Sequence, residues 1–160
     1  MPFSKLQWLF PIAVALHNGE EAIWMPAWDA EHAARLPVHP GAEEIRIALA
    51  VLTVAALAVT YLSVRKGPNS IWAYLTFGYI VTMLVNVFVP HVPVALVFHG
   101  YAPGVVTAVL VNLPLTSFLA LKAVREGWVR GRKAAVFAVA VPVTLALMIG
   151  AFFFVGEAGL

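Results

Sequence analysis

Five runs of about 20 predominantly apolar residues follow one another along a chain of only 160 residues. A helix needs about this length to cross the hydrocarbon core of a bilayer, because each residue advances its axis by about 1.5 Å. The sequence therefore predicts an all-α integral membrane protein, a five-helix transmembrane bundle that forms a single domain over residues 1–160. The runs lie at about residues 6–28, 45–64, 71–90, 105–121 and 134–155.

The composition agrees with this fold class and excludes several kinds of site. Hydrophobic residues make up 62% of the chain and charged residues 11%, whereas soluble proteins are about half apolar and a quarter charged. The chain has no cysteine, so a bound metal would be held by histidine and carboxylate side chains. The formal net charge of +2 does not indicate a nucleic-acid partner, because in a membrane protein the placement of Lys and Arg matters more than their sum.

The placement of the basic residues predicts the orientation of the bundle. With five spans, the N-terminus and the second and fourth connections share one side of the membrane, and eight of the ten Lys and Arg residues fall there. Cytoplasmic loops carry such an excess, so we expect a cytoplasmic N-terminus and an exterior C-terminus. The eight are Lys5, Arg65, Lys66, Lys122, Arg125, Arg130, Arg132 and Lys133, and the other two are Arg35 and Arg46.

The third connection, residues 90–104, is unusual because it is apolar yet contains Pro90, Pro93 and Pro103. The segment 92–98 is too short to cross a bilayer. Proline also removes a backbone donor and bends or ends a helix. We therefore expect this connection to be either a bent continuation of the third span or a re-entrant piece.

The first span contains His17, Glu20 and Glu21, and these are the strongest candidates for function. A carboxylate near the bilayer centre costs about 2.5–3.5 kcal/mol, so ionisable residues there are functional candidates by default. On a helix, His17 lies three and four residues before the two glutamates, so the three side chains can share one flank and bind one cation. The structural alternative is that the two carboxyl groups lie at a cavity mouth or share a proton.

Further polar residues fall in the same outer half of the membrane under the predicted topology. Asn86 and His91 lie in the outer part of the third span, His99 follows in the third connection, and Asn112 is near the middle of the fourth span. We therefore predict one site. Its metal ligands are drawn from His17, Glu20, Glu21, His91 and His99, and its catalytic groups from Glu20, Glu21, Asn86 and Asn112.

The motif His17-x-x-Glu20-Glu21 resembles the signature of the HXXEE family of small bacterial membrane proteins. The resemblance also includes Asn86, His91 and the stretch 99–104, and it covers roughly residues 8–115. It implies a multi-pass protein of the bacterial inner (cytoplasmic) membrane. The family name brings no established reaction, so the function has to be argued from the residues.

The residues support a divalent-metal site that serves a hydrolase or a related enzyme acting on a lipid-like substrate. Imidazole and carboxylate without thiolate suit zinc, iron or manganese, with zinc favoured, and an open coordination position would activate a water molecule. Asn86 and Asn112 would orient ligands or polarise a substrate oxygen. Two alternatives remain open: a metal-free acid/base isomerase of a sterol-like or isoprenoid lipid, and a small carrier or binding protein for a cation or lipid.

Overall fold

The chain folds into helices connected by short loops. The computed structural model describes residues 1–36 and 39–157, and within these ranges it has no strand, which confirms the all-α prediction. Two five-residue turns, η2 and η3, are π-helical. The elements are α1 (Phe3–Leu6), α2 (Leu9–His32), the 3₁₀ turn η1 (Ala33–Arg35), α3 (Ala42–Lys66), α4 (Ile71–Asn86), η2 (Val87–His91), α5 (Val92–Val97), α6 (Val105–Thr107), η3 (Ala108–Asn112), α7 (Leu113–Arg125) and α8 (Gly131–Glu157).

Four helical segments are long and apolar enough to cross a membrane, so the structure supports a multi-pass membrane protein. Helix α2, which corresponds to the first predicted span, is 24 residues long but carries the acidic residues of the motif. The five-span count and the orientation of the termini therefore stay predictions. The predicted exterior C-terminus, Leu160, lies outside the described residues. The four segments are Ala42–Lys66, Ile71–Val97, Val105–Arg125 and Gly131–Phe154.

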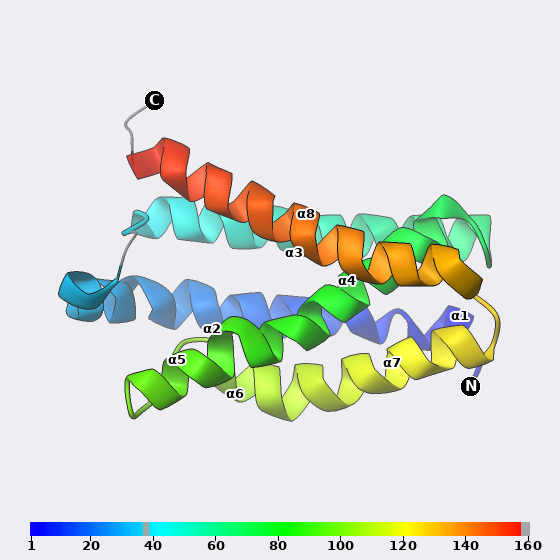
Figure 1. The fold of residues 1–160 in the computed structure, drawn as a ribbon, viewed down its shortest axis with the longest axis horizontal. Helices are drawn as coiled ribbons and strands as arrows, with labels where there is room; N and C mark the ends of the chain where they lie inside the picture. The colour runs from blue at the N-terminus through cyan, green and yellow to red at the C-terminus, as the bar shows by residue number, and fades with distance from the viewer. Residues whose placement is uncertain (37–38, 158–160) are drawn as a thin grey trace.

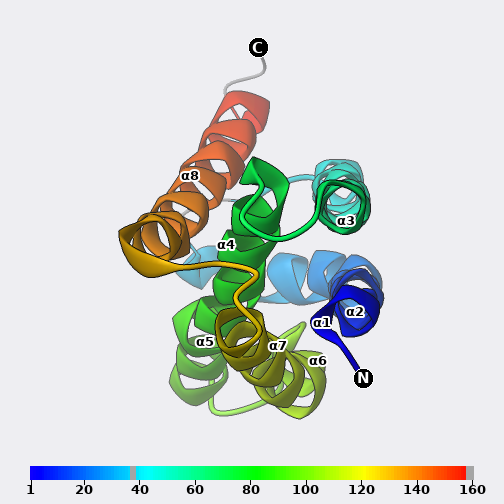
Figure 2. The same ribbon diagram turned by 90° about the vertical axis from the view of Figure 1, so that its right-hand side faces the viewer.

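Helix α4 lies in the middle of the bundle and packs against α3, α7 and α8 (Figures 1 and 2). Its contact with α8 depends on Gly78. A Cβ atom at this position would lie 2.6 Å from Cγ2 of Val141 and 2.7 Å from the carbonyl oxygen of Phe137. Small residues allow helix backbones to approach closely in membranes, which is the role of glycine here.

Polar contacts between helices fix the positions of α2 and α4 against α3. The side-chain amide of Asn18 donates hydrogen bonds to the carbonyl oxygen of Leu49 at 3.0 Å and to Oγ1 of Thr53 at 2.9 Å. The Tyr79 hydroxyl donates to the carbonyl oxygen of Leu52 at 2.9 Å. Such hydrogen bonds hold transmembrane helices together where the lipid offers no alternative partner.

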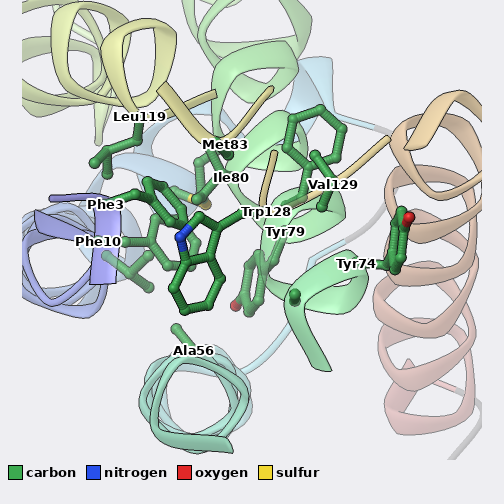
Figure 3. Packing of buried hydrophobic residues seen from close by; sticks show 14 residues of the cluster. Phe3, Phe10, Ala56, Tyr74, Tyr79, Ile80, Met83, Leu119, Trp128 and Val129 are labelled. Carbon is green, nitrogen blue, oxygen red and sulfur yellow. The ribbon is translucent and has the colours of Figure 1, made fainter. Parts of the chain in front are cut away.

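A cluster of buried apolar side chains lies at the end of the bundle that contains α1. Side chains from α1, α2, α4, α7 and the following loop converge there, and Figure 3 shows Phe3, Phe10, Ile80, Leu119 and Trp128 pointing toward one another. The rings of Phe3 and Trp128 lie 5.3 Å apart. This packing fixes the first turns of α2, and the motif lies on the following turns of the same helix.

The third connection is a bent continuation of α4 rather than a separate span. The helix passes through η2, where Val89 has the extended angles φ −148° and ψ 107°, and then continues as α5 to Val97. The bend lies at Pro90, which has no backbone donor for a helical hydrogen bond. The chain then returns through residues 98–104 to α6.

Candidate metal centre

Three side chains of the predicted site meet in the interior of the bundle. His17, Glu21 and His91 are all buried, with exposed fractions of 1%, 7% and 3%. Each offers one ligand atom, and these atoms all lie within 4.8 Å of one another. The group therefore has the geometry to hold a metal ion.

The distances between the ligand atoms suit a small tetrahedral ion. Nε2 of His91 lies 3.1 Å from Nε2 of His17 and 3.5 Å from Oε1 of Glu21, and Nε2 of His17 lies 3.9 Å from Oε2 of Glu21. Zinc binds such ligands at about 2.0–2.2 Å, which places ligand atoms about 3.3 Å apart in a tetrahedron. The two Glu21 distances go to different oxygens of its carboxylate, so this side chain has to adjust for one oxygen to reach that spacing from both imidazoles. Three protein ligands would leave one position open.

The sequence brings these side chains together by two different means. His17 and Glu21 are one turn apart on α2, so the helix itself aligns them. His91 comes from the bend after α4, which also brings the amide nitrogen of Asn86 within 2.9 Å of His91 Nε2 and 3.2 Å of His17 Nε2. On a straight helix Asn86 and His91 would point about 140° apart, so the bend at Pro90 is necessary for the site.

The hydrogen bonds on the far side of each imidazole determine which nitrogen faces the group. Nδ1 of His91 lies 3.0 Å from the carbonyl oxygen of Pro103. A carbonyl only accepts, so Nδ1 of a neutral His91 carries the proton and Nε2 presents a lone pair. The same holds for His17, whose Nδ1 lies 2.9 Å from Oγ1 of Thr107. That hydroxyl donates its own proton to Oε2 of Glu20 at 2.6 Å, so it accepts from His17.

Glu20 lies outside the group formed by His17, Glu21 and His91. Its carboxylate accepts hydrogen bonds from the Tyr101 hydroxyl at 2.8 Å, the backbone N–H of Gly104 at 3.2 Å and both the N–H and the hydroxyl of Thr107 at 2.9 and 2.6 Å. Burial and the hydrogen bond to Glu20 raise the pKa of Tyr101, so this phenol stays a neutral donor. Glu20 thus joins α2 to the start of the helix that begins with α6 and orients Thr107 toward His17.

Gly104 is the point where this helix approaches the group most closely. Its φ of +82° is in the left-handed region that favours glycine. A Cβ atom there would lie 2.5 Å from Cε1 of His91, 2.9 Å from Cε1 of His17 and 3.0 Å from Cγ of Glu21. The site therefore requires glycine for two reasons, the backbone conformation and the space.

The remaining predicted residues lie in different surroundings. His99 is exposed in the loop after α5 and is not a member of the group. Asn112, in η3, is completely buried, and neither its amide nitrogen nor its oxygen has a hydrogen-bond partner among the described residues. Sequence reasoning did not assign roles to Pro103, Gly104 and Thr107. The stretch 99–104 was part of the family resemblance, which was the available signal for the first two.

A cavity of about 500 Å³ adjoins the group and is lined by residues of α2, α3, α4, η2 and α8. Glu21 and Asn86 line it and also contact the histidines. A small molecule in this cavity can therefore reach the open side of the group. Its other walls are largely apolar, which is typical of ligand sites for lipophilic molecules.

A protein-family model described as a protein of unknown function with an HXXEE motif matches residues 8–119, which include the whole site. The chain belongs to the HXXEE family. The motif that names the family corresponds here to His17, Glu20 and Glu21. In this structure the histidine and the second glutamate lie in the buried group, and the first glutamate anchors the neighbouring helix.

One relative matches the chain over most of its length. The chain is 26% identical over 148 residues to the uncharacterized protein YrkK of Bacillus subtilis (strain 168). The match covers 92% of this chain and 93% of the relative. No solved structure matches the chain.

Proposed function

We propose that this HXXEE protein is a metal-dependent membrane enzyme, a hydrolase or a close relative of one, that acts on a lipid-like substrate in the bacterial cytoplasmic membrane. His17, Glu21 and His91 hold a divalent ion, with zinc favoured by the ligand types and by the three-ligand arrangement. When bound, the ion supplies a Lewis acid and lowers the pKa of a water molecule at its open position.

The observation that carries the proposal is the fixed protonation of the two histidines. Pro103 and Thr107 direct both Nδ1 protons away from the group, so two imidazole lone pairs and a carboxylate face one another. Three acceptors at these distances in a buried site repel one another unless a proton or a metal cation lies between them, and the chelator experiment below distinguishes the two. The Asn86 amide donates to both imidazoles. It is a neutral group, so it does not compensate the charge of the Glu21 carboxylate.

The hydrogen bonds to the far nitrogen of each imidazole support roles for the residues around the site. Metal-bound histidines normally donate their other N–H to a carbonyl or carboxylate, which fixes the ring orientation. His91 does so directly through Pro103, and His17 does so through Thr107 to Glu20. On this proposal Glu20 is a positioning residue, whereas Asn86 is placed to orient a substrate oxygen at the edge of the cavity.

Hydrolysis of a long-chain fluorogenic acyl ester by protein in lipid vesicles tests the proposal. We expect turnover by the wild type, loss of turnover with a strong chelator, and recovery on addition of zinc. His91→Gln should be inactive, while His99→Gln, the same change at an exposed histidine, should match the wild type. Absence of turnover, or turnover that is indifferent to chelator, would refute the proposed metal-dependent hydrolase.

A further inference from the structure

The cavity beside the metal centre has two chemically different sides. Its polar lining comes from α2 and α4, which contribute Asn18, Glu21, Tyr79, Thr82 and Asn86. The walls from α3 and α8 are formed only by apolar residues and glycine. With a volume of about 500 Å³, the cavity is within the range of about 300–1,000 Å³ that is common for small-molecule sites. An amphiphile with one apolar chain and one oxygen-bearing end matches these two sides.

The cavity lies next to the lipid-facing surface between α3 and α8. A smaller groove of about 150 Å³ on the outer side of this seam shares Ala48, Leu52, Leu145 and Ile149 with the cavity. The groove also includes Val51 and Met148, each with 62% of its surface exposed. Helix α8 packs mainly on α4 and has few contacts with α3, and its end rises away from α3 (Figure 1). The seam between α3 and α8 is therefore the part of the cavity wall that lies beside this lipid-facing groove.

The charges of the lining select the chemical class of the occupant. The described lining residues include one carboxylate, Glu21, and no Lys or Arg. A phosphate or another anionic head group would lose its hydration there without a basic side chain to compensate, and it would face the Glu21 carboxylate. A neutral ester or alcohol has no such cost, and its oxygen matches the polar part of the lining at Glu21 and Asn86.

We propose that the cavity binds a neutral single-chain lipid, an ester or long-chain alcohol, with its apolar chain between α3 and α8 and its oxygen at Glu21 and Asn86. The identification of that oxygen as the reacting end rests on the proposed function. The binding of the chain does not, because the walls of α3 and α8 contain no ligand of the metal centre.

Photolabelling tests this site with a defined probe, a long-chain alcohol that carries a diazirine in the middle of its chain. The probe is added to protein in phosphatidylcholine vesicles, and the labelled peptides are identified by mass spectrometry. We expect labels on the cavity side of α3 and α8. The phosphate monoester of the same alcohol should label these positions much less, whereas equal labelling by the two probes would overturn the assignment of a neutral head group.

Two matched substitutions on α3 separate the cavity from the general lipid surface. Ala48 lines both the cavity and the groove, while Ala50 is exposed on the same helix and lines neither. Ala48→Phe should reduce labelling of α8 by about tenfold because the ring fills the volume of the chain. Ala50→Phe should leave it unchanged. Ala146→Phe, on the opposite wall, repeats the test if Ala48→Phe does not fold, and unchanged labelling in the folded variant would overturn the proposal.

The same labelling in chelator-treated protein distinguishes this inference from the proposed function. We expect the alcohol to label α3 and α8 whether or not an ion is present. Labelling without metal content or hydrolysis would refute the proposed function and leave the lipid site standing. Metal content and hydrolysis without labelling of the cavity walls would refute the lipid site alone.

Discussion

Replacement of Gly104 by alanine should damage the metal centre more than any other change of one methyl group in its surroundings. The new Cβ atom would lie 2.5 Å from Cε1 of His91 and 2.9 Å from Cε1 of His17, and real Cβ atoms are not found below about 3.0 Å. The residue is buried, and both contacted atoms belong to rings that are held by hydrogen bonds from behind. One of the two imidazoles must therefore move out of the group.

The cost has two parts that the structure separates. The φ of +82° costs a residue with a side chain about 1–2 kcal/mol. Insertion of a methyl group into a filled interior costs about 1–3 kcal/mol more. We therefore expect Gly104→Ala to lower the free energy of unfolding by about 2–5 kcal/mol and to reduce the metal content of the purified protein.

Gly131→Ala is the matched control for this prediction. Gly131 also has a positive φ, +57°, but a Cβ atom there meets nothing within 4 Å. The control should therefore show only the cost of the backbone conformation and keep its metal. The assay is unfolding in detergent micelles by denaturant, with metal measured in the same preparations. If Gly104→Ala is no less stable than Gly131→Ala and holds its metal, the close approach of Gly104 to the histidines is wrong.

Three further predictions concern the Thr107 hydroxyl, the contact of Glu126 with the N-terminal helix, and the topology. Thr107→Val removes the hydroxyl that joins Glu20 to His17 and should weaken metal binding by about 10–100-fold. The control Thr82→Val loses only a hydrogen bond within its own helix, so it should leave metal binding unchanged. Hydrogen bonds from Lys122 and the backbone N–H of Phe3 lower the pKa of Glu126 from its ordinary 4.5, so its stabilisation is present at neutral pH and lost as the pH falls through that lowered pKa. The melting temperatures of wild type and Glu126→Gln should therefore differ at pH 7 and converge in acid, and a constant difference would contradict this. A reporter enzyme that works only outside the cytoplasm should be active when it is fused after Leu160. Activity of a reporter that works only in the cytoplasm would overturn the five-span topology.

The sequence predicted the helical class and one half of the candidate metal centre because both depend on local spacing. Apolar runs long enough to span a bilayer are readable without tertiary information. The pair His17 and Glu21 is likewise local, since residues four apart on a helix lie on one flank. The helix boundaries extend beyond the predicted runs, for example to residues 42–66 in α3, because polar residues at the ends continue the helix outside the apolar segment.

The other half of the centre could not be predicted because it depends on a bend and on packing between distant segments. Periodicity does not say how far Pro90 turns the chain, so His91 and His99 remained equivalent candidates, although one is buried in the group and the other is exposed. Glu20 and Glu21 were also treated alike. Neighbours on a helix point about 100° apart, and only the position of α6 shows that Glu20 contacts Thr107 and Gly104.

The central claim is that His17, Glu21 and His91 form a metal centre, and the most direct test is the metal content of freshly purified protein. Elemental analysis of the wild type should give about one divalent ion per chain, and His17→Gln should give none, because a site with two ligands binds far more weakly. Chelator should lower the melting temperature of the wild type and leave that of His17→Gln unchanged, since the ion binds only the native state. A wild type that contains no metal and melts at the same temperature with and without chelator would contradict the account.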